Sequence, residues 1–396
     1  MPIVVALAVL LILYGFVEYR RHMACVRAVP IRIHVNGTRG KSSVTRLIAA
    51  GMRAGGIRTF AKTTGTEARM IFDDGSEMRI PRPGRANIVE QLMVFRTAAR
   101  RNVKAIVIEC MALQPHIQWL AEHRIVHSTC GVITNARADH LDVMGPTVQH
   151  VAYFLCNTVP DDGILFSAER DPANLGVLRA EAGKMRTRLV ESRAEDVTDE
   201  EIRRFTYVEH KENVALALAV CAHHGVPREA AIEGMIACTP DPGVLRLHRI
   251  EQYGKQIEFA NAFAANDRDS TLLIMDRLGV RPGGDRKVMV LFNTRGDRIQ
   301  RAAQFGEMIA KDFRADYFLL TGQFTDAVES LAVRHGADPE RIFNLGNIEE
   351  HQVNTVFEKV LSLTPARSIV VGVGNIGGIG HAIAQFFQNR GAELAH

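Results

Sequence analysis

The sequence lacks paired cysteines and any strong excess of charge. Its six cysteines are scattered through 396 residues and form no CxxC pair, which argues against a disulfide framework or a zinc knuckle. A net charge of +4 is too small to predict nucleic-acid binding. Charged residues make up 23% of a chain that is 47% hydrophobic, which argues against disorder. The composition predicts a globular protein of two or three domains.

The amino-terminal stretch from Pro2 to Val17 has no charged residue. As a helix it spans about 24 Å, slightly less than the ~30 Å core of a bilayer. A cleaved signal peptide would carry positive charge before this stretch, whereas Arg20 and Arg21 follow it. A buried core helix is the other alternative. We expect an uncleaved membrane anchor over residues 1–19, with the rest of the chain in the cytoplasm.

Short β-branched runs alternate with helix-length segments along the rest of the chain, and this alternation predicts parallel α/β sheets. Predicted strands begin near residues 31, 104, 130, 163, 288, 317 and 368. The PDPG sequence at Pro240–Gly243 is a strong chain break. We therefore expect one domain over residues 28–243 and a smaller domain over residues 244–396.

A glycine-rich turn joins the first predicted strand, Ile31–Val35, to a predicted helix, Ser43–Ala54. Its glycines let backbone N–H groups point at phosphate oxygens, and the helix N-terminus adds partial positive charge. Lys41 can reach the β- and γ-phosphates of ATP, and the Ser42 hydroxyl can ligate Mg²⁺. The predicted ATP-binding residues of this turn are Gly37, Thr38, Arg39, Gly40, Lys41, Ser42 and Ser43.

Two further polar sites follow predicted strands. Glu109 ends the apolar run KAIVIE, and the carboxyl end of a strand is where α/β sheets place ligand-binding residues. A carboxylate there can hold Mg²⁺, although a helix cap or a salt bridge is the alternative. His140 lies in the sequence TNARADHLDVMG with Asn135, Asp139 and Asp142. A lone histidine is more often structural, but this one is surrounded by acids.

The shortened GTxGK[ST] loop, the glutamate segment and the N-x-x-x-DH-x-D pattern resemble the Mur ligase superfamily, which includes folylpolyglutamate synthetase. The resemblance implies an α/β fold, with a P-loop central ATPase domain and a Rossmann-like C-terminal ligase domain. It implies an enzyme that uses ATP and Mg²⁺, with Lys41, Glu109 and His140 as catalytic residues. Ser42, Glu109 and His140 are then the expected metal ligands.

The resemblance extends to the adenine side but leaves one gap. Asn213 matches an asparagine that contacts adenine, and Arg246 matches an arginine that reaches the ATP phosphates; an ordinary surface arginine is the alternative for Arg246. Many Mur ligases use a carbamylated lysine after the metal-binding histidine. This chain has no lysine between Lys104 and Lys184, so either another group takes that role or a second metal is bound by fewer protein ligands.

The second domain departs further from the superfamily pattern. The stretch that opens this domain lacks the Asp and His that are usual in the superfamily. Asn261 and Asn266 are the residues of this stretch that could bind ribose or substrate. Asp297 and Arg298 match a turn that closes over an acyl-phosphate or grips a carboxylate. A late GxGxxG turn contains Gly372, Gly374 and Gly377. We interpret it as a tight turn of the Rossmann-like domain, with a true nucleotide site as the alternative.

Within the superfamily, the sequence resembles the ATP-dependent ligase subunit of bacterial poly-γ-glutamate synthases. The phosphate loop begins 17 residues after Arg20, which leaves no room for the UDP-binding domain of cell-wall ligases. The resemblance implies that ATP converts a glutamate carboxylate to an acyl-phosphate, which the amine of another glutamate attacks. The candidate substrate-binding residues are Arg69, Arg82, Arg85, Asn266, Asp297 and Arg298.

The implied partners are glutamate, the growing polymer, the membrane, a small multi-span membrane subunit and other capsule-synthase subunits. Assembly with further copies of the same chain stays open. Two alternatives remain within and outside the superfamily: a folylpolyglutamate-synthetase-like or other Mur-type amino-acid ligase, and a membrane-tethered P-loop ATPase. A GxGxxG oxidoreductase is a weaker third alternative.

Overall fold

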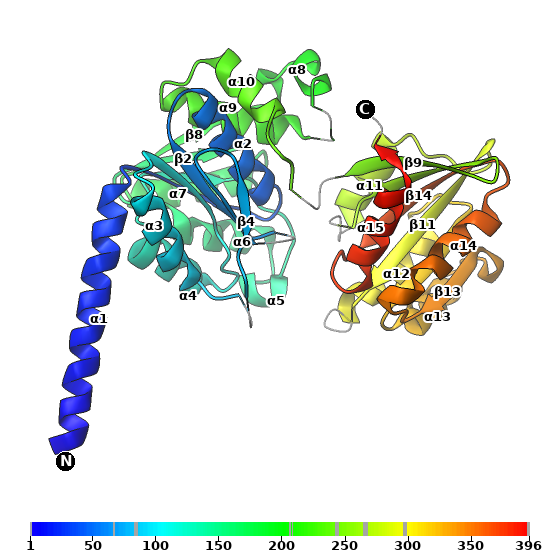
Figure 1. The fold of residues 1–396 in the computed structure, drawn as a ribbon, viewed down its shortest axis with the longest axis horizontal. Helices are drawn as coiled ribbons and strands as arrows, with labels where there is room; N and C mark the ends of the chain where they lie inside the picture. The colour runs from blue at the N-terminus through cyan, green and yellow to red at the C-terminus, as the bar shows by residue number, and fades with distance from the viewer. Residues whose placement is uncertain are drawn as a thin grey trace. The chain divides into compact units, whose positions relative to one another are not determined.

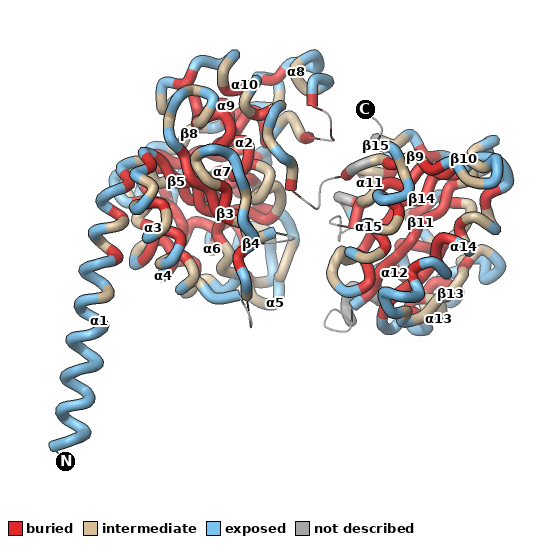
Figure 2. The backbone as a smooth tube through the Cα atoms, viewed as in Figure 1, coloured by how far each residue is buried: buried red, intermediate tan, exposed pale blue. Residues whose placement is uncertain are grey.

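The computed structural model describes residues 2–65, 68–82, 86–205, 207, 209–241, 245–263, 268–295 and 299–393. The chain divides into two compact units (Figure 1). Unit 1 consists of Met1–Phe205 and Glu209–Asp241, and unit 2 of Thr206–Val208 and Pro242–His396. Each unit contains its own sheet and its own buried core (Figure 2).

The first helix, α1 (Pro2–Ala28), extends beyond the apolar run that begins it. Its last turns pack on unit 1, where Val26 is buried and His22 Nε2 lies 2.8 Å from the Ile125 carbonyl oxygen. Its most apolar part is wholly exposed (Figure 2). Within the part of the chain that the structure describes, α1 alone is long and apolar enough to cross a membrane.

An eight-stranded sheet forms the centre of unit 1, in the order β4-β3-β2-β5-β1-β6-β7-β8. Six strands are parallel, and β3 and β4 extend one edge as antiparallel strands. Strands β2, β5, β6 and β7 are buried along their whole length, because helices cover both faces of the sheet. The strands are β1 (Ile31–Asn36), β2 (Thr59–Thr63), β3 (Arg69–Ile71), β4 (Glu77–Arg79), β5 (Ala105–Glu109), β6 (Cys130–Ile133), β7 (Ile164–Ser167) and β8 (Arg188–Glu191).

The helices of unit 1 connect and cover these strands. Helix α2 packs closely on α9 and α10, since an added Cβ at Gly234 would lie only 2.6 Å from the Ala50 carbonyl oxygen. The helical segments are α2 (Lys41–Ala54), α3 (Glu90–Arg100), α4 (Pro115–Leu120), η1 (Ala121–Val126), α5 (Leu141–Met144), α6 (Val148–Leu155), η2 (Cys156–Thr158), α7 (Pro172–Lys184), η3 (Ala194–Asp196), α8 (Asp199–Arg203), α9 (Lys211–His223) and α10 (Arg228–Ile236).

The sheet of unit 1 reverses its winding beside β1. The chain leaves β1 toward β2 on one side, whereas it leaves β6 toward β7 on the other side. This switch point lies at the carboxyl ends of the neighbouring strands β1 and β6. Open α/β sheets bind ligands at this position. The predicted phosphate loop and the His140 segment follow these two strands.

Unit 2 contains a seven-stranded sheet in the order β13-β12-β11-β14-β10-β9-β15. Side chains alternate along β11: Val290 and Phe292 join the core on one face, and Met289 and Leu291 join the core on the other. The strands are β9 (Arg246–Gln252), β10 (Lys255–Asn261), β11 (Arg286–Thr294), β12 (Tyr317–Gly322), β13 (Ile342–Gly346), β14 (Arg367–Gly374) and β15 (Ala392–Glu393). The helical segments are α11 (Arg268–Arg277), α12 (Ile299–Lys311), α13 (Thr325–Arg334), η4 (Pro339–Arg341), η5 (Glu350–Gln352), α14 (Val353–Leu363) and α15 (Ile379–Arg390).

Candidate active site

The loop between β1 and α2 is built for close contact with its neighbours. Gly37 and Gly40 have positive φ angles of 135° and 82°, a conformation that favours glycine. An added Cβ at Gly37 would lie 2.0 Å from Thr134 Oγ1, and one at Gly40 would lie 2.6 Å from Asn213 Oδ1. Both glycines are therefore needed for the path of this loop and for its packing.

Lys41 begins α2 and folds back over the loop. Its Nζ donates hydrogen bonds to the carbonyl oxygens of Gly37, at 2.6 Å, and Thr38, at 3.3 Å. Burial lowers the pKa of Lys41, and the Glu109 carboxylate opposes this shift. The ammonium is thus held over the loop at the start of a helix, where phosphate groups are favoured.

Ser42 and Glu109 meet directly, although they lie 67 residues apart. Ser42 Oγ donates to Glu109 Oε2 at 2.9 Å, and the Thr64 backbone N–H donates to the same oxygen at 2.7 Å. Burial raises the pKa of Glu109, and Lys41 opposes this shift. Strand pairing explains the meeting, because Glu109 ends β5 opposite Val35 of β1.

The donor set of this pair fits Mg²⁺. A hydroxyl and a carboxylate supply hard oxygen ligands, and Mg²⁺ commonly takes one or two protein carboxylates with waters and substrate phosphates. Among the described residues, no group of three or more His, Cys, Asp or Glu side chains is arranged to hold a metal ion. A metal site at Ser42 and Glu109 therefore needs oxygens from phosphate and water.

The loop after β6 is bonded to the phosphate loop. The Thr38 backbone N–H donates to the Asn135 carbonyl oxygen at 3.0 Å, and Thr38 Oγ1 donates to Asn135 Oδ1 at 2.7 Å. Asp139 forms an ion pair with Arg39 at 3.4 Å, and the His140 ring lies 3.8 Å from Asp139. Asp139 therefore joins His140 to the phosphate loop.

A buried cluster that the sequence analysis did not predict lies beside Glu109. Lys62 is fully buried, with its Nζ 2.8 Å from Glu90 Oε1. Burial lowers the pKa of Lys62, and Glu90 opposes this shift. Arg82 donates to both oxygens of Glu90 and also to Thr64 Oγ1, so the cluster is joined to Glu109 through Thr64. A lysine inside the strand-like run TFAKT was the one signal in the sequence.

Two of the predicted substrate-binding arginines are engaged with acids of unit 1. Arg69 forms an ion pair with Glu77 at 3.4 Å, and Glu77 also bonds Arg46. Arg82 is bound by Glu90. The predicted residues that lie outside the described part of the chain are Arg85, Asn266, Asp297 and Arg298.

The residues predicted to bind ATP outside the phosphate loop fall in both units. Asn213 Nδ2 donates to Glu209 Oε1 at 2.8 Å, and its other side-chain atoms lie against Gly40 of the phosphate loop. Arg246 begins β9, and its side chain lies outside what the structure describes. Asn261 ends β10 opposite Gly372, and its buried Oδ1 has no hydrogen-bond partner among the described residues.

Unit 2 contains a polar hollow of about 490 Å³. The ends of β11 and β12 and the turn before α15 line it, with Asn293, Arg295 and Gly377 among its residues. Asn293 Nδ2 donates to the carbonyl oxygens of Asn375 and, at 3.0 Å, Gly377. The GxGxxG turn is therefore held open by an amide side chain, and its backbone forms one wall of the hollow.

Comparisons with known proteins define the class to which this fold and site belong. The Mur ligase middle domain family matches residues 35–225. A folylpolyglutamate synthase of Mycobacterium tuberculosis, solved with ADP and AMPPCP, superimposes with a TM-score of 0.70 at 18% identity and covers 95% of this chain and 96% of its own. The folylpolyglutamate synthase of Thermotoga maritima superimposes with a TM-score of 0.64 at 15% identity, and the match covers 96% of each chain. These findings confirm the predicted Mur-ligase-type α/β fold.

Sequence relatives narrow the class to one family. The poly-gamma-glutamate synthase CapB C-terminal domain family matches residues 247–390. The capsule biosynthesis protein CapB of Bacillus anthracis is 35% identical over 93% of this chain and 79% of its own length. The PGA synthase CapB of Bacillus subtilis is 34% identical over 95% of this chain and 94% of its own length. The chain belongs to the CapB family of the Mur ligase superfamily, as the sequence predicted.

Proposed function

We propose that this chain is an ATP-dependent ligase that joins glutamates through γ-amide bonds into poly-γ-glutamate. The family relationship supports an ATP-dependent amide ligase, and the names of the relatives support glutamate as the substrate. The observation that carries the proposal is that Glu109, at the end of β5, meets Lys41 and Ser42 of the phosphate loop. In this junction a cation, a hydroxyl and a carboxylate meet where an α/β sheet binds phosphate.

The residues of the loop fit phosphoryl transfer to a carboxylate. The γ-phosphoryl group of ATP passes to the γ-carboxylate of one glutamate, and the resulting acyl-phosphate is attacked by the amine of another glutamate, which expels phosphate. Lys41 exchanges its contacts with the loop carbonyls for phosphate oxygens as charge develops there. Ser42 and Glu109 hold Mg²⁺ in this proposal, and His140 orients the loop or takes part in a second metal site. A bound Mg²⁺ supplies charge neutralisation on the transferring group.

The polar hollow of unit 2 is our candidate site for the glutamate that is added. It presents the Arg295 guanidinium, the Asn347 amide and the start of α15, and groups of these kinds bind carboxylates. Asp297 and Arg298, which lie outside the described residues, follow shortly after Arg295 in the sequence. This placement assigns phosphoryl transfer to unit 1 and recognition of the amino acid to unit 2.

Helix α1 is proposed to anchor the enzyme in the membrane, with both units in the cytoplasm. The exposed apolar stretch of α1 and the arginines that follow it support this placement. We propose a small multi-span membrane subunit and other capsule-synthase subunits as partners, because a charged polymer that is made inside the cell needs a route across the membrane.

The test uses membranes that contain the full chain and its neighbouring subunits, supplied with ATP, Mg²⁺ and radiolabelled glutamate. We expect a high-mass anionic product that resists ordinary α-peptidases and is absent with the variant Lys41→Ala. The matched control is Lys184→Ala, at an exposed lysine paired with Glu181, which should leave the product unchanged. ATP hydrolysis that does not depend on glutamate would instead indicate a tethered ATPase.

The second candidate function is the extension of a folate by glutamate. The solved structures compared above are folylpolyglutamate synthases, and this is the reason to test it. Their identity to this chain is 15–18%, which supports the fold alone. Label that enters a folate in the same assay would favour this alternative.

A further inference from the structure

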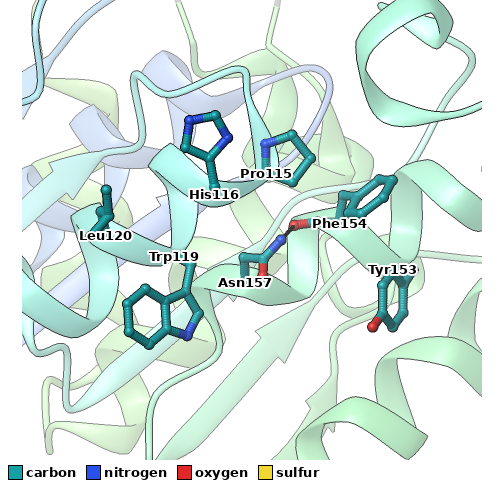
Figure 3. A pocket seen from close by; sticks show the side chains of 7 residues that line it. All are labelled: Pro115, His116, Trp119, Leu120, Tyr153, Phe154 and Asn157. Atoms are coloured by element: carbon teal, nitrogen blue, oxygen red, sulfur yellow. Dashed lines mark hydrogen bonds between the residues drawn. The ribbon is translucent and has the colours of Figure 1, made fainter.

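Unit 1 has an aromatic hollow that the proposed chemistry does not use. It has a volume of about 460 Å³ and lies between α4 and α6, with His116, Trp119, Leu120, Tyr153, Phe154 and Asn157 in its lining. Figure 3 shows the Trp119 indole and the Tyr153 ring on two sides of the hollow, with Asn157 between them. We define these six residues as the aromatic hollow.

The aromatic hollow is lined by exposed side chains. Trp119 is 41% exposed and Tyr153 is 48% exposed, although both are large side chains that proteins usually bury. Leu113, two residues before α4, and Leu141, which begins α5, are also exposed. A surface of this kind marks an interaction site more often than it faces water.

This surface lies at the end of unit 1 toward which α1 extends. The segment α4 continues directly into η1, whose Ile125 carbonyl oxygen is bonded by His22 of α1. Trp119 precedes Ile125 by six residues, which is a rise of about 9 Å along a helix. In Figure 1, α1 leaves unit 1 beside α3 and runs downward, and α4 and α5 lie at the lower end of unit 1.

The chemistry of the surface fits the headgroup layer of a bilayer. Trp and Tyr combine an apolar ring with a polar tip, and they concentrate at membrane–water interfaces. The Arg124 guanidinium lies 5.5 Å from the Trp119 ring centre, and Arg20 and Arg21 are exposed on α1. These cations suit anionic headgroups. The nearby acids are Asp161, 3.4 Å from His123, Glu18 of α1, and exposed Asp142, which follows Leu141 in α5.

We propose that the aromatic hollow and the leucines around it rest on the headgroup layer of the membrane that α1 enters. This contact would hold unit 1 against the bilayer as a second attachment, in addition to the helix. The inference rests on the proposed anchor. It goes beyond that anchor, because a helix alone would leave Trp119 in water.

The chain has one tryptophan, so its intrinsic fluorescence reports Trp119 alone. The full chain is reconstituted into vesicles of phosphatidylcholine and phosphatidylglycerol, some with a nitroxide on the headgroup or the upper acyl chain. We expect the lipid nitroxide to quench Trp119 and aqueous iodide to leave it unquenched. The double variant Trp119→Phe and Glu200→Trp moves the indole to exposed α8, at another end of unit 1 (Figure 1), where iodide and not lipid should quench it.

A charge in the aromatic hollow provides the matched test. Tyr153→Glu should reduce lipid quenching of Trp119, whereas Tyr253→Glu, at an exposed tyrosine of unit 2, should not. Quenching of Trp119 by iodide alone overturns the proposal. Protection from both quenchers also overturns it, and indicates a second copy or another protein on this surface.

Flotation with the vesicles and glutamate-dependent ATP turnover are measured on the same samples. If the chain floats and turns over ATP but lipid does not quench Trp119, the proposed anchor and ligase stand and the proposed headgroup contact is wrong. A chain that fails to float loses the anchor and this inference together. Neither result bears on the phosphate loop, so the failures are distinguishable.

Discussion

Both units contain a strand, a glycine turn and a helix, but the two turns are equipped differently. In unit 1 the turn between β1 and α2 carries Lys41 and Ser42, and the neighbouring strand β5 supplies Glu109. In unit 2 the turn between β14 and α15 is held by the Asn293 amide. The comparison teaches that a glycine turn at a helix start supplies only a concave backbone. The side chains that neighbouring strands bring to it decide which ligand it favours.

The strongest way to break this comparison is to remove the cation of unit 1. We expect Lys41→Ala to lower ATP turnover by roughly 10²–10³-fold or more, because the charge on the phosphoryl group loses its main compensation. The measurement is phosphate release by the folded variant, with Lys184→Ala as the control. A folded Lys41→Ala protein with the parent's rate would contradict the assignment of the phosphate loop.

The next effect concerns the carboxylate of unit 1. Glu109→Gln should raise the Mg²⁺ concentration needed for half-maximal ATP turnover by about 10–100-fold, since a carboxylate ligand becomes an amide. Glu212→Gln, at an exposed position of α9, is the control. The same titration of His140→Ala tests the other predicted ligand. A curve like the parent's would show that the contact of His140 with Asp139 is structural.

Alanine in each turn sharpens the difference between the units. Gly37→Ala should raise KM for ATP by about 10-fold or more, because its Cβ would clash with Thr134 Oγ1. Gly378 lines the polar hollow and has a φ of 67° with no atom near an added Cβ, so Gly378→Ala should cost about 1–3 kcal/mol of stability through backbone strain and leave KM for ATP unchanged. KM for ATP and thermal unfolding distinguish the two effects. Equal KM values in both variants would contradict the division of roles.

A smaller effect is expected from the amide of unit 2. Asn293→Ala removes two hydrogen bonds that hold the turn, so KM for glutamate should rise about 10-fold while KM for ATP stays unchanged. The exposed Asn354 of α14 provides the control variant Asn354→Ala. If KM for ATP rises instead, the GxGxxG turn of unit 2 binds the nucleotide, which is the alternative given in the sequence analysis.

The smallest effect concerns the strand that carries the phosphate loop. Burial alone would lower the pKa of His34, but the Glu122 carboxylate, whose Oε2 lies 2.7 Å from His34 Nδ1, helps to raise it to about 9. A raised pKa stabilises the fold below pH 6.5, and this stability is lost as the pH rises through 9. We expect the free energy of unfolding to fall by about 1–3 kcal/mol over this range.

Thermal unfolding in detergent at pH 6.5 to 9 measures this loss. The variant Glu122→Gln keeps a hydrogen-bonding group beside His34 but removes the charge, so its midpoint should be lower at pH 6.5 and change less with pH. A parent midpoint that does not change between these pH values would contradict the buried ion pair.

Much of the architecture follows from local sequence. The alternation of apolar runs predicts strands β1, β5, β6, β7, β11, β12 and β14, because buried parallel strands need short β-branched segments. The ends of some elements differ from the prediction by several residues. Strand β14 extends to Gly374, and helix α1 continues beyond the predicted anchor to Ala28. The extension of α1 depends on tertiary packing, since His22 and Val26 are buried by unit 1.

The sequence by itself determined the phosphate loop, because its glycines, Lys41 and Ser42 lie within six residues. Their spacing along the chain is enough to form a phosphate-binding turn. It also determined the apolar helix and, through its relatives, the family. Only the tertiary structure decided which distant side chains meet. Glu109 reaches Ser42 across 67 residues and Asn293 reaches Asn375 across 82, because strand order in a sheet differs from chain order. Lys62 with Glu90 and the aromatic hollow have the same origin, since packing brings together residues whose pairing no local pattern specifies.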